Sequence, residues 1–460
     1  MRLRHLATTA LALSLLSAPS VQADTLDLLA TLRLADQNDP NLAAIRASAR
    51  AAEQGPIIAR ASLLPHLAAN GSLGDTTLKQ DAPNPMGGTI PTRTDYRSTQ
   101  WSVKLSQPLF DWSSWHQFSA AKLQLSQAQS DALDKTQNLF MAVSEAYFDV
   151  LRADDNLTLA IAQEAALNRQ RDQAEARFKV GLIARADVME AEAQRDSATA
   201  QRLTAEIGLS NSREKLNAAV GRDIGKLARL REDLPLDAPV PDDAEAWAKL
   251  ARERNPGLVA ARLQSQAALA ARQAQRGSYL PQVGLFASHS VRENTDVSGA
   301  NQSISFNAGE TDVVGIEAQW ELFASGRTRA LAQQATDNAE ASKQSALARE
   351  HQIVTAARTS YLTLKVDSAR LQARQRAQAS AQQAYTATKA GYDVGTRNIV
   401  DLLLAETNLY LAKRDYANAR YDYVINSLRL QAAAGMLSEA NVAKVNSWLM
   451  PNPLSTTTAD

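Results

Sequence analysis

The chain has 460 residues, and its 49 basic and 49 acidic side chains give a formal net charge of zero. This balance argues against nucleic-acid binding, which usually requires a basic surface. The sequence contains no cysteine, which excludes disulfides, thiolate chemistry and a lipid anchor on cysteine.

The first predicted element is a secretory signal peptide over residues 1–23. Arginines at positions 2 and 4 precede an apolar run from Leu6 to Leu16, and Val21-Gln22-Ala23 is typical of a cleavage site. The run is too short for the alternative, an uncleaved anchor that crosses a membrane. We therefore expect the mature chain to be exported.

The mature chain is predicted to be a tandem duplication with a spacing of about 214 residues. The matched positions are Leu64-Pro65 with Leu280-Pro281, Tyr147 with Tyr361, Val180-Gly181 with Val394-Gly395, and Asp187 with Asp401. We expect a first repeat over 24–221, an equatorial linker over 222–246, a second repeat over 247–435, and a C-terminal equatorial segment with a polar tail over 436–460.

Each repeat is predicted to begin with a helix of about 25 residues, from Leu42 to Pro65 or from Leu258 to Pro281. Two strands of about ten residues follow, joined by loops rich in turn-forming residues over 81–94 and 294–312. A long helix comes next, then a glycine turn, and then a helix of roughly 35 residues.

The long helix of the first repeat is indicated by the absence of proline between residues 113 and 234. Apolar residues recur there at every seventh position, which keeps one stripe against a neighbouring helix only if the helices supercoil. A helix over about 113–178 would be roughly 100 Å long. The stripe consists of Phe118, Leu125, Ala132, Leu139, Ala146, Ala153, Ala160, Leu167 and Ala174.

The strand segments alternate apolar with polar residues, as in Trp101-Ser102-Val103-Lys104-Leu105-Ser106. This pattern fits a soluble sandwich or the wall of a membrane barrel. Export and the aromatic residues near the strand ends favour the barrel, whereas in a sandwich the same aromatics would be ordinary core residues. Four strands cannot close a barrel, and in lipid all backbone polar groups must be paired, so a barrel requires several chains.

The two repeats carry related motifs around their glycine turns. The second repeat contains Lys389-Ala390-Gly391-Tyr392-Asp393-Val394-Gly395-Thr396-Arg397, followed by Asp401 and Asn408-Leu409-Tyr410. The first repeat contains Ala176-Arg177-Phe178-Lys179-Val180-Gly181-Leu182, followed by Asp187. Both stretches closely resemble the TolC-type outer-membrane efflux proteins, and the resemblance covers essentially the whole mature chain, including the duplication.

The resemblance implies a mainly α protein with a β-barrel. Three chains would form a 12-stranded barrel in the outer membrane, continuous with a long α-helical coiled-coil barrel across the periplasm. The implied partners are two further copies in a homotrimer, outer-membrane lipid, a periplasmic membrane-fusion adaptor, and an inner-membrane pump of the RND or ABC type. The implied function is a passive exit duct for a tripartite efflux pump or a type I secretion system.

The resemblance also assigns roles to the glycine turns and their neighbours. The adaptor would dock on the periplasmic tips at Gly181, Leu182, Gly395 and Thr396. Tyr392 and Arg397 would link neighbouring coiled coils, with Asp187 as one acceptor, and Asp401 would line the constriction at the closed end. Spacing alone allows a simpler reading, in which each glycine ends a helix and each aspartate stabilises a helix dipole.

One position departs from the pattern of this family. Its best-known members carry a second aspartate one turn after the first, but the present chain has Leu404 there. The matching position in the first repeat is Glu190, which would restore negative charge near the tip if its side chain faces the lumen.

The five histidines are scattered, and no metal-binding spacing, phosphate-binding loop or nucleophile motif occurs. We therefore expect neither an enzymatic activity nor a cofactor. The alternative function is an exported coiled-coil spacer or adhesin without a conduit. Such a protein would need no amphipathic strands and no matching acids at two turns.

Overall fold

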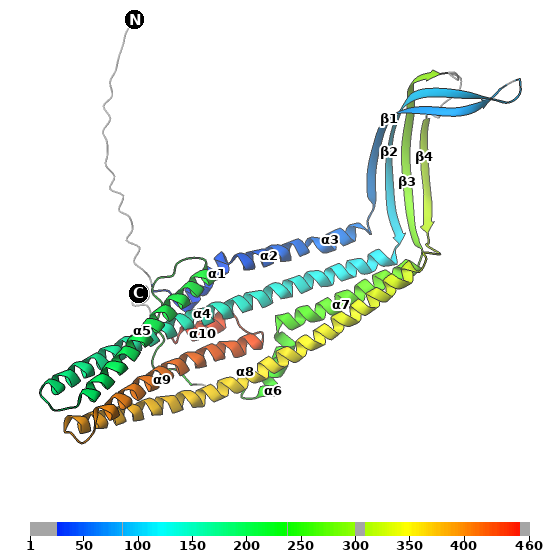
Figure 1. The fold of residues 1–460 in the computed structure, drawn as a ribbon. Helices are drawn as coiled ribbons and strands as arrows, with labels where there is room; N and C mark the ends of the chain where they lie inside the picture. The colour runs from blue at the N-terminus through cyan, green and yellow to red at the C-terminus, as the bar shows by residue number, and fades with distance from the viewer. Residues whose placement is uncertain (1–24, 85, 237, 300–308, 451–460) are drawn as a thin grey trace, which may run out of the picture.

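The computed structural model describes residues 25–84, 86–236, 238–299 and 309–450. The molecule is elongated, with one sheet at one end and helices that run from the base of this sheet to two turns at the opposite end (Figure 1). The predicted signal peptide over 1–23 and the polar tail after residue 450 lie outside the described residues.

Two very long helices form the frame of the molecule. Helix α4 spans Trp112–Lys179 and has 68 residues, and helix α8 spans Arg327–Asp393 and has 67 residues. The predicted helix over 113–178 is therefore confirmed. Its seven-residue stripe lies against neighbouring helices, because all nine stripe residues are buried or half-buried in the single chain. The carboxylate of Asp111 caps the start of α4 by accepting a hydrogen bond from the Ser114 N–H, at 3.0 Å.

Each long helix is followed by a shorter helix that returns along it. Helix α5 spans Arg185–Val220 and packs against α4, and α9 spans Ile399–Ala433 and packs against α8. Their 36 and 35 residues confirm the predicted length. The turns contain Gly181 at φ +76° and Gly395 at φ +80°, a left-handed conformation that side chains with a Cβ atom rarely adopt.

The predicted 25-residue helix of the first repeat is wrong in its length. It is divided into α2 (Pro40–Ala52) and α3 (Gln54–Ala61). Pro56 explains the break, because proline has no N–H to donate to the carbonyl four residues earlier. In the second repeat α7 (Pro256–Arg276) is continuous and is followed by a 3₁₀ turn over Gly277–Tyr279.

Three further short helices were not predicted. Helix α1 (Leu28–Asn38) precedes α2, and α6 (Ala244–Arg254) precedes α7, so that each repeat begins with a helix pair. A capping side chain before proline separates the helices of each pair: Asp39 accepts from the Leu42 N–H at 2.7 Å, and Asn255 accepts from the Leu258 N–H at 3.2 Å. Helix α10 (Glu439–Asn446) lies in the C-terminal segment.

The four strands form one antiparallel sheet in the order β1-β2-β3-β4. The strands are β1 (His66–Pro83), β2 (Thr89–Phe110), β3 (Gln282–Gly299) and β4 (Gly309–Gln319), with 18, 22, 18 and 11 residues. The predicted length of about ten residues is therefore wrong for three of them. Within the predicted loops, residues 81–83, 89–94, 294–299 and 309–312 are strand, and residues 300–308 lie outside the described residues.

Cross-strand contacts explain why such polar segments pair. Arg97 on β2 contacts Asp75 on β1 with 2.8 Å between Nε and Oδ1, and the Thr77 hydroxyl donates to Asp95 at 2.5 Å. Contacts of this kind stabilise paired strands where the intrinsic strand propensity is low. The β1–β2 hairpin consequently continues to Pro83 and Thr89, past the part of β2 that pairs with β3 (Figure 1).

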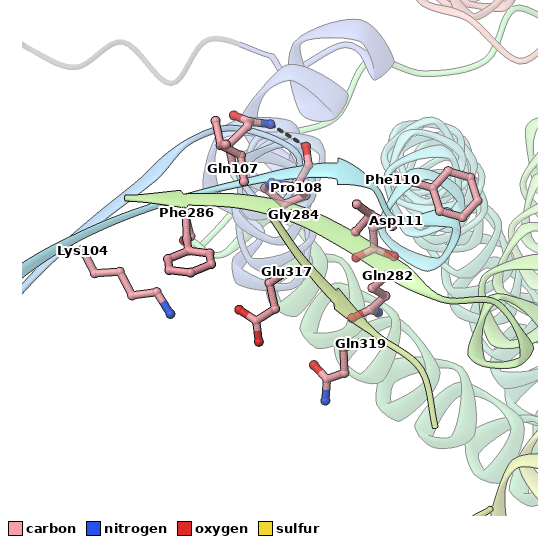
Figure 2. Close-up of a pocket in the computed structure, with 13 residues that line it drawn as sticks. Lys104, Gln107, Pro108, Phe110, Asp111, Gln282, Gly284, Phe286, Glu317 and Gln319 are labelled. Atoms are coloured by element: carbon pink, nitrogen blue, oxygen red, sulfur yellow. Dashed lines mark hydrogen bonds between the residues drawn. The ribbon is translucent and has the colours of Figure 1, made fainter. Parts of the chain in front are cut away.

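One face of the sheet is mainly apolar and the other mainly polar, as the alternation predicted, but the apolar face also carries the His289–Asp312 pair beside Trp101. Trp101, Val103 and Leu105 share a face, and Lys104 and the serines beside it occupy the other. Near the helical end of the polar face, Lys104, Glu317 and Gln319 project to the same side as the ring of Phe286, around a cavity of about 200 Å³ (Figure 2). Within the described residues, β1 and β4 each have one edge without a partner strand.

The main core lies midway along the helices, where α1, α4, α9 and α10 meet the predicted linker over 222–246. Tyr147 of α4 is fully buried, and its hydroxyl lies 3.1 Å from the Leu26 carbonyl and 3.0 Å from the Ala228 carbonyl. The buried Arg420 of α9 donates to the Leu230 carbonyl at 3.2 Å. These bonds hold the linker against the long helices.

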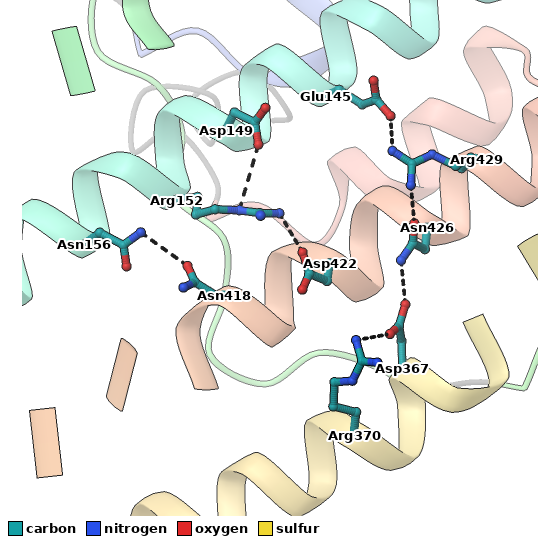
Figure 3. A network of polar contacts seen from close by, with 10 residues as sticks. All are labelled: Glu145, Asp149, Arg152, Asn156, Asp367, Arg370, Asn418, Asp422, Asn426 and Arg429. Atoms are coloured by element: carbon teal, nitrogen blue, oxygen red, sulfur yellow. Dashed lines mark hydrogen bonds and ion pairs between the residues drawn. The ribbon is translucent and has the colours of Figure 1, made fainter. Parts of the chain in front are cut away.

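A row of polar side chains also joins α4, α9 and α8 (Figure 3). Arg152 on α4 contacts Asp422 on α9, with 2.8 Å between Nη2 and Oδ1. The Asn426 amide of α9 donates to the buried Asp367 of α8 at 2.6 Å. Because these bonds occupy fixed positions along each helix, the row fixes the register of α9 between α4 and α8.

Candidate gate and docking site at the helical tips

The first tip comprises residues 180–184 between α4 and α5. The Gly181 N–H donates to the Phe178 carbonyl and the Leu182 N–H donates to the Arg177 carbonyl, both at 2.9 Å. These bonds satisfy carbonyls that the end of α4 leaves free, as glycine-terminated helices commonly do. Leu182 is 72% exposed, so the tip presents an apolar side chain at the end of the molecule.

The second tip comprises residues 394–398 between α8 and α9. The Thr396 backbone N–H and hydroxyl both donate to the Gly391 carbonyl, at 2.8 Å and 3.0 Å. A Cβ at Gly391 would lie 2.8 Å from Cγ of Arg397, so a larger residue there would require the Arg397 side chain to shift. Both tips are thus hydrogen-bonded hairpins whose end residues are exposed.

The two aspartates occupy the first turns of the return helices. Asp187 accepts a hydrogen bond from the Ala184 N–H at 3.1 Å, which caps α5. Asp401 lies 3.7 Å from the Arg397 guanidinium, measured from Oδ2 to Nη1, and its own N–H donates to Asn398 at 2.8 Å. Both positions are favourable for the helix dipole.

Tyr392 joins the two halves of the molecule at the tips. Its ring is only 5% exposed and packs in an apolar cluster with residues of α4, α5 and α9. The Arg177 guanidinium at the end of α4 lies 4.5 Å from the ring centroid, a cation–π contact. Within the described residues, the Tyr392 hydroxyl is buried without a hydrogen-bond partner.

The structure brings the predicted gate residues together in part. Arg397 and Asp401 form an ion pair on one chain, whereas the predicted acceptor Asp187 lies on the other tip and caps its own helix. Leu404 is 60% exposed. Glu190 is half-buried and accepts a hydrogen bond from Gln194 at 3.2 Å.

Sequence reasoning missed two residues of this region, Arg177 and Glu406. Arg177 stands within the quoted motif, but its contact with Tyr392 depends on how the two repeats pack. Glu406 is 2% exposed on α9, and burial raises the pKa of its carboxyl group. The only sequence signal for Glu406 was an acid near the apolar residues Leu402 and Leu403.

Both repeats match one known family, described as outer membrane efflux protein, over residues 31–222 and 247–436. The outer membrane protein TolC of Vibrio cholerae is 34% identical over 416 residues, which cover 90% of this chain and 92% of that protein. The alkaline protease secretion protein AprF of Pseudomonas aeruginosa is 30% identical over 425 residues, which cover 92% of this chain and 87% of that protein.

A solved structure has the same fold. The outer membrane protein VceC of Vibrio cholerae superposes with a TM-score of 0.75 at 19% identity, covering 89% of this chain and 96% of that chain. Across the described part of the chain, every helix is too short or too polar to cross a membrane.

Proposed function

The chain belongs to the outer membrane efflux protein family, and we propose from this premise how its sheet and its tips work together in export. It is an outer-membrane exit duct for efflux or type I secretion, with a periplasmic tunnel. The observation that carries the proposal is the position of the sheet and the tips at opposite ends of helices about 100 Å long.

The sheet supports assembly as a homotrimer. Strands β1 and β4 each leave one edge of backbone N–H and C=O groups unpaired by the described chain. Such edges are not tolerated in lipid, so β4 of one copy pairs with β1 of the next until the barrel closes. Three copies supply twelve strands, with the apolar face of Trp101, Val103 and Leu105 toward outer-membrane lipid and the polar face of Lys104 toward the lumen.

The helices then form a tunnel around the same axis. Its wall consists of α4 and α8 with their return helices, while α2, α3 and α7 complete the wall toward the sheet. The exposed hairpins at Gly181, Leu182, Gly395 and Thr396 are the surfaces on which a periplasmic adaptor docks. An inner-membrane pump of the RND or ABC type supplies cargo and energy, and the duct itself conducts passively.

The second tip closes the tunnel at rest. Three copies of Asp401 lie near the axis, where their negative charge concentrates in a narrow constriction. Arg397 pairs with Asp401 in the single chain and reaches Asp187 of a neighbouring copy in the trimer, while Tyr392 anchors α8 to the first tip through Arg177. Glu190 adds negative charge where Leu404 provides none.

The relatives support two classes of cargo. TolC-type proteins and the alkaline protease secretion protein AprF both match over most of this chain. In this proposal the duct conducts passively, so the adaptor and the pump select the cargo.

The assembly is tested by purification from the outer membrane in detergent. We expect a protein mass close to three mature chains, measured by light scattering that separates detergent from protein. A monodisperse folded monomer, or fractionation of the protein with the inner membrane, would overturn the trimeric duct.

A further inference from the structure

Glu192 and Glu406 stand at equivalent positions of the two repeats, 214 residues apart, but their surroundings differ. Glu192 on α5 is exposed, whereas Glu406 on α9 is 2% exposed. Of these two equivalent glutamates, Glu192 faces solvent and Glu406 lies in the interior between helices. This difference calls for a physical reason, because an unpaired buried charge is costly.

Groups from three helices face the Glu406 carboxyl group. Helix α4 contributes Arg169 and Gln170, and α8 contributes Lys389 and Tyr385. Tyr410 faces the carboxyl group from α9 itself. Gln170 donates a hydrogen bond to the carboxyl group, but Oε2 has no hydrogen-bond partner within the described residues.

Desolvation is the largest influence on this group and raises the pKa of Glu406 above the ordinary 4.5. The positive charges of Arg169 and Lys389 oppose that shift without cancelling it. Both cations are exposed, so water screens them. The protonated carboxyl group therefore suits the packed interior, and the ionised group favours an arrangement in which water reaches Oε2.

The position of Glu406 connects this preference to the tip. Asp401 precedes it on the same helix, and Leu402 and Leu403 between them are buried in the cluster that holds Tyr392. A movement of the start of α9 away from α4 and α8 would carry Asp401 outward and expose Glu406 to water. The same movement thus opens the proposed constriction and removes the cost of burying an ionised Glu406 carboxylate, because water can then hydrate it.

We propose that Glu406 is a positioning residue of the gate: its protonated carboxyl group holds the start of α9 against α4 and α8, and its ionisation favours the open tip. This inference rests on the proposed gate at Asp401. The direction of the expected pH dependence follows from the burial of Glu406. The closed arrangement is most stable below the ordinary pKa of glutamate and loses stability as the pH rises through the raised value.

The test uses full-length mature trimers in planar bilayers, with single-channel open probability recorded from about pH 4 to about pH 8. For wild type we expect the open-to-closed ratio to rise with pH, by about tenfold for each unit by which opening lowers the pKa of Glu406. In Glu406→Gln channels the open-to-closed ratio should stay, over the whole pH range, near the low value that wild type has at acid pH. The matched control Glu192→Gln should follow wild type.

Two further arms separate titration of Glu406 from titration of Asp401 and from a failure to conduct. In Asp401→Asn channels the rise of the open-to-closed ratio with pH should persist, and its loss there would assign the titration to Asp401 and overturn the role of Glu406. The temperature of thermal unfolding gives a readout without conductance: for Glu406→Gln it should exceed the wild-type value above pH 7 and equal it near pH 4.

Glu406→Gln channels that gate with the same pH profile as wild type would overturn the role of Glu406 and leave the proposed duct intact. Folded trimers that never conduct would reject both the role of Glu406 and the proposed duct.

Discussion

Arg177, in the last turn of α4, lies 4.5 Å from the ring centroid of Tyr392, in the last turn of α8. The contact joins the two repeats immediately above both tips. Tyr392 is buried there among residues of four helices, so the pair ties the relative position of the two hairpins to a packed cluster. The proposed gate is therefore supported from inside each chain.

The first prediction concerns this support. The double change Tyr392→Phe with Arg397→Ser removes the Arg397–Asp401 ion pair and the Tyr392 hydroxyl, which has no partner within the described residues, but it preserves the buried ring and its contact with Arg177. We expect a higher single-channel conductance and greater sensitivity of cells to large antibiotics, at unchanged trimer yield. Arg177→Ala should act in the same direction, because it removes a cation–π contact of about 0.5–1 kcal/mol at a partly exposed site.

The control for these variants is Arg397→Lys, which keeps the positive charge but loses the planar guanidinium. It should fall between wild type and the double variant. A correctly folded double variant with wild-type conductance would show that Tyr392 and Arg397 do not close the tip.

The second prediction concerns cation block from the periplasmic side. Three Asp401 carboxylates near the axis should attract multivalent cations, so Asp401→Ala should relieve block and reduce cation selectivity. Leu404→Asp should strengthen block by adding a second acidic ring. Glu190→Gln should weaken block, because Glu190 is proposed to add negative charge to the constriction.

The measurement is the cation concentration that halves conductance in each channel. If Asp401→Ala leaves both this concentration and the ion selectivity unchanged, Asp401 serves only to stabilise the dipole of α9.

The third prediction concerns the polar row between α8 and α9. Asp367 is 2% exposed and accepts hydrogen bonds from Asn426 and from Arg370, at 2.6 Å and 3.1 Å. Asp367→Ala leaves the Asn426 amide without its acceptor, and we expect it to lower the free energy of unfolding by about 1–3 kcal/mol. A lower temperature of thermal unfolding would report it. Asp337→Ala, at an exposed position of the same helix, is the control and should change this temperature little.

The sequence predicted the long helices because their signals are local and repeated. A proline-free span with a seven-residue stripe specifies one geometry, and a glycine after it specifies a turn. The signal for the break between α2 and α3 is equally local, since Pro56 stands inside the predicted helix and cannot donate a backbone hydrogen bond there. The short helices α1 and α6 are too brief for a clear periodic pattern.

The strand ends and the interior of the site could not be predicted in the same way. Residues 74–83 contain few strand-forming residues. They nevertheless continue β1, because Thr77 and Asp75 contact Asp95 and Arg97 on β2. The burial of Glu406 depends on α4 and α8 closing over it, whereas the same acid at Glu192 is exposed. Pairing and burial of this kind are decided by contacts between segments far apart in the chain.

The central claim is that this chain forms a closed but openable conduit, and single-channel recording of purified trimers in a planar bilayer tests it most directly. We predict discrete cation-selective channels of small conductance that multivalent cations block from the tip side, with block relieved in Asp401→Ala. Folded trimers that insert into the bilayer and show no channels in wild type, in Asp401→Ala or in the double variant Tyr392→Phe with Arg397→Ser would contradict the account and favour a spacer without a conduit.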